Sequence, residues 1–136
     1  MALALNDYTQ RRINEEQVIW LTTVKPNGAP VPTPVWFIWS DDAFLIYSSP
    51  NTLKVRNIQA NLHVTLNFNG DPYGGNIVVF TGEAVIDAVG ASSGETSAYL
   101  AKYAEGMKQI GDTPETFTQK YSTVIRVRPT RVRADE

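Results

Sequence analysis

Apolar and polar residues alternate with a period of two in several short segments of the chain, which is the pattern of β-strands. Turn-forming residues separate these segments, as in the run from Lys25 to Gly28, where Pro26 and Gly28 suit the dihedral angles of a tight turn. The pattern predicts six strands. They cover residues 17–24, 31–39, 44–48, 63–68, 77–87 and 121–133.

Helical spacing of apolar residues, together with capping residues, predicts helices between some of these strands. Asp7 is the expected N-cap of the first helix, and Ser92 or Ser93 caps the longest one. The second helix begins just after a loop that ends in Asn51 and Thr52. The predicted helices cover residues 7–16, 53–60, 92–106 and 114–120.

Strands joined by hairpins form an antiparallel sheet. Several of the strands are apolar on both faces, as where Ile77 and Val79 alternate with Val78 and Phe80. A closed sheet has one interior, so the second apolar face has to be covered by helices or by another subunit. We therefore predict one mainly β domain over residues 1–136, a six-stranded antiparallel β-barrel with peripheral helices that forms a homodimer.

Three prolines occupy alternate positions at Pro30, Pro32 and Pro34. Proline has no backbone N–H to donate to a neighbouring strand, so one side of this strand is expected to be unpaired. Trp36 and Phe37 follow directly. An unpaired, aromatic-rich strand can lay its backbone against a flat heterocyclic ring. The simpler interpretation is an edge strand that prolines protect from aggregation.

A candidate phosphate site lies between residues 47 and 54. The third strand ends in Ser48 and Ser49, Thr52 precedes the next helix, and Lys54 lies in the first turn of that helix. Free N–H groups and the positive end of the helix dipole attract anions at such a position. The hydroxyl groups and the lysine ammonium can add donors to the same phosphate. The alternative is a capped helix that carries a surface cation.

The amino-acid composition limits the kinds of binding or catalytic site that the chain can form. The chain has 136 residues, a net charge of −2, one histidine and no cysteine. The slightly negative net charge does not indicate nucleic-acid binding. The absence of cysteine excludes disulfides and thiolate metal sites. His63 alone forms neither a catalytic triad nor a metal site, so no metal is expected. No apolar run approaches the roughly 20 residues that span a membrane. We expect a cytoplasmic protein that does not bind membranes.

The sequence resembles the split-barrel flavin-binding superfamily of pyridoxamine 5′-phosphate oxidase and its short deazaflavin-dependent relatives. The resemblance implies a six-stranded split β-barrel, a homodimer and a cofactor in the groove between subunits. Two arginines that bind phosphate in the oxidase are replaced, one by Leu53 and the other near Val35 or Trp36, which favours the short relatives. The similar segments are residues 21–24, 27–28, 32–37, 47–54 and 61–66.

The implied function is an oxidoreductase that moves a hydride between FMN, or an 8-hydroxy-5-deazaflavin coenzyme, and a small organic substrate. The alternative is a non-catalytic flavin carrier on the same fold. No catalytic residue is assigned, because the ring of the cofactor does the chemistry. Asn67, Asn69 and Tyr73 are weaker candidates for contacts from the second subunit. The expected cofactor-binding residues are Thr33, Pro34, Val35 and Trp36 at the ring, Ser48, Ser49, Thr52 and Lys54 at the phosphate, and Asn67.

Overall fold

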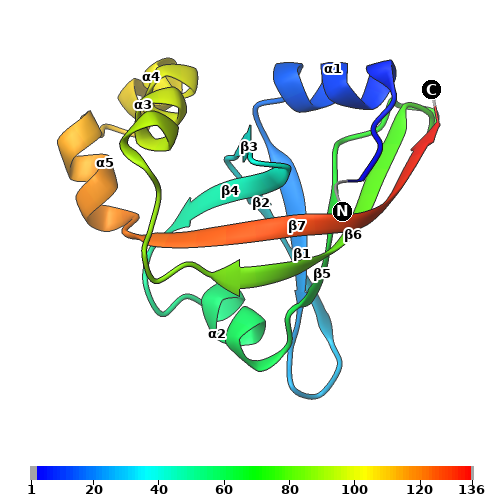
Figure 1. The fold of residues 1–136 in the computed structure, drawn as a ribbon, viewed down its shortest axis with the longest axis horizontal. Coiled ribbons are helices and arrows are strands. Elements are labelled where there is room, and N and C mark those ends of the chain that lie inside the picture. The colour runs from blue at the N-terminus through cyan, green and yellow to red at the C-terminus, as the bar shows by residue number, and fades with distance from the viewer. Residues whose placement is uncertain (1–2, 136) are drawn as a thin grey trace.

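A computed structural model describes residues 3–135 and shows seven strands in one antiparallel sheet, in the order β2-β1-β5-β6-β7-β4-β3. The sheet curls into a half-barrel with helices around it (Figure 1). The mainly β prediction is therefore confirmed. The strands are β1 (Ile19–Val24), β2 (Pro30–Val35), β3 (Ile38–Ser40), β4 (Ala43–Ser48), β5 (His63–Asn67), β6 (Ile77–Ile86) and β7 (Thr123–Asp135).

The segment 31–39 was expected to be one strand, and this part of the prediction is wrong. It forms β2 and β3, which lie at opposite ends of the strand order and are separated by Trp36 and Phe37. The break occurs because the backbone of Phe37 is hydrogen-bonded by the side chains of Lys102 and Tyr103 instead of by a neighbouring strand. The prolines lie on β2, which pairs with β1 alone, so the predicted edge strand is confirmed.

The inner face of the sheet holds the main apolar core. Val64, Leu66 and Phe68 are buried at alternate positions, as the pattern predicts, and Leu21 and Phe80 flank Leu66 on the neighbouring strands. The α2 helix (Leu53–Ala60) covers one end of this core with two buried apolar side chains. None of the helices in residues 3–135 is long and apolar enough to cross a membrane.

The other helices differ in detail from the prediction. The α1 helix (Asp7–Glu15) has its N-cap at Asn6, one residue before the expected Asp7, because the Asn6 side chain accepts a hydrogen bond from the Thr9 N–H. Ser92 caps α3 (Ser93–Lys102) through a capping box with Glu95, as expected. The predicted helix 92–106 is broken at Tyr103, and α4 (Ala104–Gln109) and α5 (Pro114–Lys120) follow.

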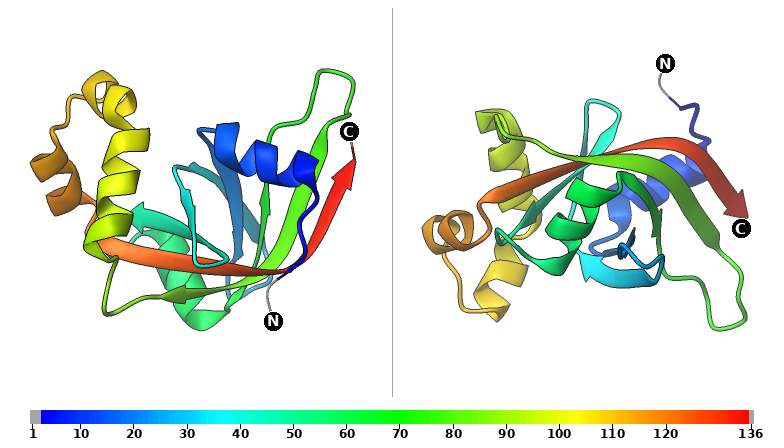
Figure 2. Two further views of the ribbon diagram at one scale, coloured as in Figure 1. Left: turned by 45° about the horizontal axis from the view of Figure 1, so that its top comes forward. Right: turned by 90° about the horizontal axis from the view of Figure 1, so that it is seen from below.

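The helices α3, α4 and α5 stand together at one side of the half-barrel, and we call them the helical arm (Figures 1 and 2). A second apolar cluster, which includes Tyr99, Tyr103 and Phe117, joins the arm to the sheet. Arg126 of β7 fastens the arm further, because its guanidinium binds Glu95 of α3 at 2.8 Å. The same guanidinium binds Asp87, which directly follows β6, at 2.6 Å. This attachment holds the arm beside the ends of β2 and β4.

The outer face of the half-barrel keeps apolar side chains that the described helices leave uncovered. Val85 on β6 has 54% of its surface exposed, and Trp20 and Val79 are partly exposed on the same side of the sheet. This agrees with strands that are apolar on both faces. The homodimer stays a prediction.

Candidate functional site

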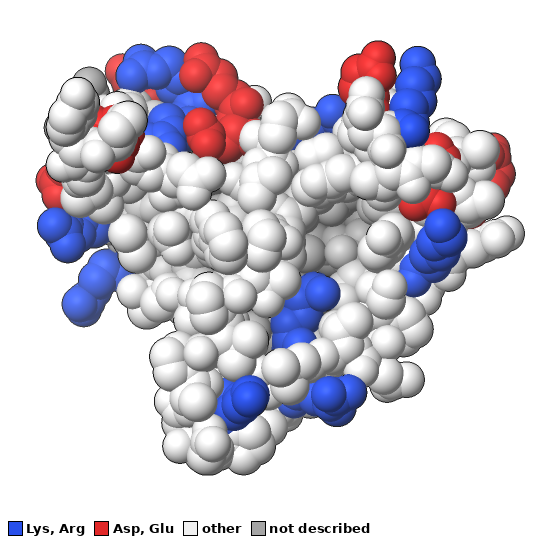
Figure 3. All heavy atoms as spheres, turned by 180° about the vertical axis from the view of Figure 1, so that it is seen from behind, with Lys and Arg blue, Asp and Glu red and all other residues white. Residues whose placement is uncertain are grey.

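A cavity of about 280 Å³ opens between the half-barrel and the helical arm. Figure 3 shows a hollow on this side of the molecule, with a Lys or Arg side chain at its lower edge. Its walls come from the β2–β3 junction, the end of β4, the start of α2 and the helical arm. The lining residues are Pro34, Val35, Trp36, Tyr47, Ser48, Ser49, Lys54, Tyr99, Ile110, Phe117 and Tyr121.

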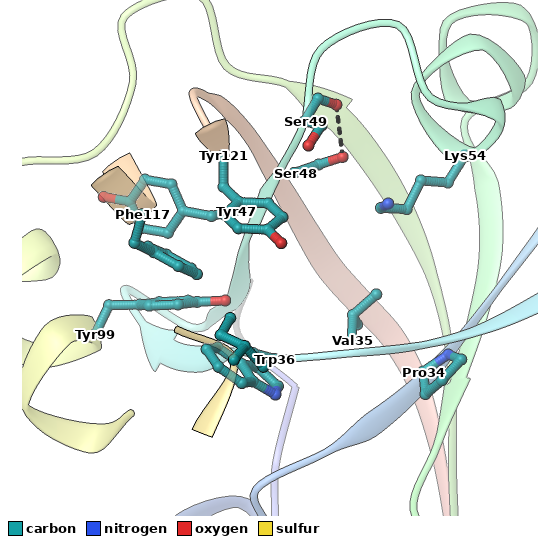
Figure 4. A pocket seen from close by; sticks show the side chains of 11 residues that line it. Pro34, Val35, Trp36, Tyr47, Ser48, Ser49, Lys54, Tyr99, Phe117 and Tyr121 are labelled. Carbon is teal, nitrogen blue, oxygen red and sulfur yellow. Dashed lines mark hydrogen bonds between the residues drawn. The ribbon is translucent and has the colours of Figure 1, made fainter. Parts of the chain in front are cut away.

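Lys54 forms one end of the cavity. Figure 4 shows its side chain running from α2 toward the cavity centre. The side chain is half-buried, and burial is the one cause that lowers its pKa, so no acidic group among residues 3–135 compensates the charge. Removing an ammonium from water costs free energy unless an anion or strong acceptor replaces the water. The geometry therefore provides a binding position for an anion.

The N-terminus of α2 adds hydrogen-bond donors at the same end. The N-cap residue Thr52 does not accept a hydrogen bond from the helix. Its hydroxyl lies instead 3.2 Å from the Ser48 hydroxyl, which also donates to the backbone carbonyl of Ser49. The first N–H groups of a helix have no partner within the helix. Without a side-chain cap, these groups are available to an anion beside Lys54.

Aromatic rings form the opposite end of the cavity. The indole of Trp36 is stacked on Tyr103, with ring centroids 4.5 Å apart and planes 2° from parallel, and it also stacks with Phe117 at 5.7 Å. Phe117 in turn contacts Tyr121 at 4.6 Å. Parallel aromatic pairs at these distances are favourable beyond the area they bury. Trp36 is thus held as a wall of the cavity by side chains of the helical arm.

The junction that carries Trp36 is fixed by hydrogen bonds from the arm. The Phe37 N–H donates to the Tyr103 hydroxyl at 2.8 Å, and that hydroxyl lies 2.9 Å from the Phe37 carbonyl and 2.7 Å from the Gln17 carbonyl. The Lys102 ammonium donates to the same Phe37 carbonyl at 2.8 Å and lies 3.7 Å from the centre of the Phe37 ring. These contacts satisfy the backbone at a point where the sheet is interrupted.

The structure brings two thirds of the sequence-derived candidates to the cavity. Three of the nine residues do not line it. Thr33 lies within β2 opposite Leu21, the Thr52 hydroxyl is 3.2 Å from the Ser48 hydroxyl, and the Asn67 amide in β5 donates to the Phe68 carbonyl. The six lining residues are Pro34, Val35, Trp36, Ser48, Ser49 and Lys54.

Two weaker candidates lie away from the cavity. The Asn69 side chain accepts a hydrogen bond from the Trp20 indole N–H at 3.0 Å. Tyr73 is at the tip of the β5–β6 loop, where 97% of its surface is exposed and Asp71 fixes its backbone. Neither residue lines the cavity of its own chain, so a role for them depends on a second subunit.

The sequence analysis did not identify the lining residues at the helical arm, or Tyr47 of β4. Tyr99 and Tyr103 are four positions apart and both buried, and Phe117 and Tyr121 repeat that spacing. This spacing puts each pair on one face of a helix. The signal was therefore visible as two aromatic faces, but nothing local indicated which cavity they would line. The lining residues missed are Tyr47, Tyr99, Ile110, Phe117 and Tyr121.

The cavity fits part of a phosphorylated ring cofactor. Its charged end offers an uncompensated ammonium and free helix N–H groups to a phosphate, and its other end is aromatic. Lys54 carries the one charge among its 11 described lining side chains. Its volume is near the lower limit of ligand pockets, which span about 300–1,000 Å³. The cavity of one chain is therefore small for a complete ligand of this kind.

Solved structures of the same fold include three that cover nearly the whole chain. An F420 reductase is 24% identical with a TM-score of 0.70, and 96% of this chain and 98% of that chain are covered. An FAD-binding protein from Mesorhizobium loti is 16% identical with a TM-score of 0.67, covering 94% and 92%. HutZ, the heme storage protein from Vibrio cholerae, is 16% identical with a TM-score of 0.68, covering 98% and 96%.

Among curated proteins, none matches this sequence. A protein-family model matches almost the whole chain, from the N-terminal helix to the end of β7. This match agrees with the split-barrel fold of the similar structures. Residues 5–135 match the pyridoxamine 5′-phosphate oxidase family, and the chain belongs to that family.

Proposed function

We propose that this protein is an oxidoreductase that uses FMN, or an 8-hydroxy-5-deazaflavin coenzyme, to reduce or oxidise a small organic substrate. The observation that carries the proposal is Lys54, a half-buried ammonium with no acidic partner in residues 3–135, aimed into a cavity with aromatic walls. The family and the fold shared with an F420 reductase and an FAD-binding protein support the same class of cofactor.

In this proposal the chain binds and orients the cofactor. Lys54, the Ser49 hydroxyl and the first N–H groups of α2 hold the phosphate, and the backbone beside Val35 and Trp36 faces the ring. When bound, the ring supplies the hydride chemistry. The protein then needs no acidic and basic side chains of its own for proton transfer. This is consistent with a cavity in which Lys54 is the one charged group among the described lining residues.

Haem binding is the alternative function, because one of the similar structures is a heme storage protein. The described side chains that line the cavity include no histidine to bind the iron. The chain has one histidine, and His63 is exposed at the start of β5, outside the cavity lining. The other ligands that the cavity could offer to iron are tyrosine oxygens, which bind as tyrosinates. Burial raises the pKa of Tyr99 well above its usual range, which disfavours the ionised phenol at this position.

We also propose that two copies of the chain pair through the outer face of the half-barrel. The partly exposed side chains of Trp20, Val79 and Val85 lie on that face. Stable obligate dimers bury more than about 2,000 Å² of largely apolar surface. A second copy also enlarges a cavity that is small for a complete flavin.

The test is a titration of the purified protein with FMN and with the deazaflavin coenzyme, followed by absorbance and fluorescence. We expect saturable binding of one of them, and turnover of its reduced form with an organic acceptor. Binding without turnover for a panel of acceptors would favour the flavin carrier. If neither cofactor bound to the protein at micromolar concentration, the proposal would be wrong.

A further inference from the structure

The segment of Trp36 and Phe37 interrupts the sheet directly beside the cavity. The β2 strand ends at Val35, and β3 begins at Ile38, at the other end of the strand order. Phe37 is fully buried, and buried backbone N–H and C=O groups need hydrogen-bond partners. Pro34, Val35 and Trp36 line the cavity just before this point (Figure 4). The conformation of the segment therefore determines the shape of that wall.

The Tyr103 hydroxyl, at the end of α3, provides partners for this backbone. It accepts a hydrogen bond from the Phe37 N–H at 2.8 Å and donates to the Gln17 carbonyl at 2.7 Å. A hydroxyl has one proton to donate, and the Phe37 carbonyl is also bound by the Lys102 ammonium at 2.8 Å. Burial raises the pKa of the Tyr103 phenol, so the hydroxyl keeps its proton. One hydroxyl thus connects the segment before β1, the β2–β3 junction and the helical arm.

The ring of Tyr103 holds the neighbouring indole as well. The planes of Tyr103 and Trp36 are 2° from parallel, with ring centroids 4.5 Å apart. Tyr103 is 2% exposed and is not one of the described residues that line the cavity. Its effect on a ligand in the cavity therefore passes through Trp36 and the backbone beside it.

We propose that Tyr103 is a positioning residue of the cofactor site, which holds Trp36 and the backbone at Val35 in the conformation that binds the cofactor ring. This inference rests on the proposed function, because the ring is that of the proposed cofactor. When a ligand binds one conformation of a mobile wall, its apparent affinity is reduced by the fraction of molecules in that conformation. The Tyr103 hydroxyl raises this fraction from outside the cavity lining.

Tyr103→Phe tests this role, because it keeps the ring that stacks on Trp36 and removes the hydroxyl. We expect the affinity for FMN or the deazaflavin coenzyme to fall about 3- to 10-fold, as when one neutral hydrogen bond that favours the binding conformation is lost. The titration is done at a temperature at which circular dichroism shows the variant to be fully folded. A residue that contributes to stability alone would leave this affinity unchanged.

A second measurement needs no cofactor. The chain has three tryptophans, so Trp20→Phe together with Trp39→Phe leaves Trp36 as the single emitter. In this background, adding Tyr103→Phe should enlarge the fast component of the time-resolved fluorescence anisotropy. The physical reason is that the junction loses hydrogen bonds and the indole then moves more freely.

Tyr8→Phe is the matched control. It also removes a hydroxyl that is bonded within the fold, to Arg12 at 2.7 Å, and Tyr8 is not among the described residues that line the cavity. It should change neither the Trp36 anisotropy nor the cofactor affinity. Hydrogen exchange of the Phe37 amide in the wild type covers the case in which Tyr103→Phe does not fold. Saturating cofactor should slow this exchange, because the cofactor selects the positioned conformation.

The outcomes separate this inference from the proposed function. Unchanged cofactor affinity in folded Tyr103→Phe, or a loss of affinity without a change in Trp36 anisotropy, would overturn the positioning role. Phe37 exchange that is not slowed by a bound cofactor would overturn it as well. If Tyr103→Phe loosened Trp36 but the wild type bound neither cofactor, the proposed oxidoreductase would be wrong, and Tyr103 would remain the residue that orients this wall of the cavity.

Discussion

Gly106 on α4 lies directly against the indole of Trp36. A Cβ atom at position 106 would be 3.0 Å from both Cη2 and Cζ2 of that ring, closer than side-chain carbons normally approach. Glycine is therefore the residue that lets the helical arm approach the β2–β3 junction. Because Trp36 is a wall of the cavity, this contact also sets the width of the cavity from a position outside its lining.

We expect Gly106→Ala to push the indole into the cavity or the arm away from the sheet. The overpacking should cost about 1–3 kcal/mol, reduced by up to about 1 kcal/mol because alanine favours helix. Chemical denaturation and tryptophan emission report the change. Gly94→Ala on α3 is the matched control, since its nearest atom would be 4.0 Å away, and it should leave stability unchanged or raised. Unchanged stability and emission in Gly106→Ala would contradict the close approach.

Lys54→Met should weaken binding of the phosphorylated cofactor while the fold is kept. A hydrogen bond to a charged group contributes about 1.5–3 kcal/mol, which corresponds to a loss of about 10- to 150-fold in affinity. Higher salt should weaken wild-type binding more than binding by the variant. Riboflavin, which has no phosphate, should bind both forms about equally.

Arg56→Ala is the charge-matched control for Lys54. The Arg56 side chain is exposed and donates to the Asn51 carbonyl at 2.6 Å, outside the cavity. Arg56→Ala should therefore reduce the affinity for the phosphorylated cofactor less than Lys54→Met does. Equal FMN affinity of wild type and Lys54→Met would make Lys54 a surface cation and move the phosphate site elsewhere on the chain.

The stability of the protein should rise with pH above about 8, through Lys102. Burial lowers the pKa of this ammonium from 10.5 to about 8, with Glu16 acting in the opposite direction. Between these two values the unfolded chain binds more protons than the folded one, so unfolding becomes less favourable as pH rises. Below pH 8 both states carry the charge, and the folded state bears the full cost of burying it.

Urea denaturation at pH 7 and pH 9 measures this effect. The midpoint of the wild type should increase relative to that of Lys102→Met, which has no amine to titrate. Lys108→Met, which replaces an exposed lysine on α4, should follow the wild type. A parallel pH dependence in wild type and Lys102→Met would show that Lys102 is not the group responsible.

The outer face of β6 offers a test of the homodimer. We expect sedimentation of the wild type to give a dimer at micromolar concentration, and Val85→Glu to shift it to a monomer, because burying an unpaired carboxylate is costly. Val89→Glu is the control, since Val89 is 96% exposed in the loop after β6. A wild-type monomer would contradict the dimer and with it a cofactor site shared between subunits.

The sequence alone predicted the features that depend on residues close together in the chain. The alternation at Val64, Leu66 and Phe68 identifies β5, because neighbouring side chains of a strand point to opposite faces. Ser48, Ser49 and Lys54 meet at one end of the cavity for a similar reason, as they flank a single strand-to-helix connection. The family resemblance rests on the same local segments.

Only the tertiary structure decided where the strand after Pro30 ends and what faces Lys54. The partner of the Phe37 N–H is Tyr103, 66 positions away, and no pattern near Phe37 predicts that bond. The aromatic wall likewise combines Trp36 with Tyr99 and Tyr121, which come from different elements. The local periodicity of the sequence predicts on which face of its own helix or strand a side chain lies. The packing of distant elements determines which other element that face contacts, and this packing forms the cavity.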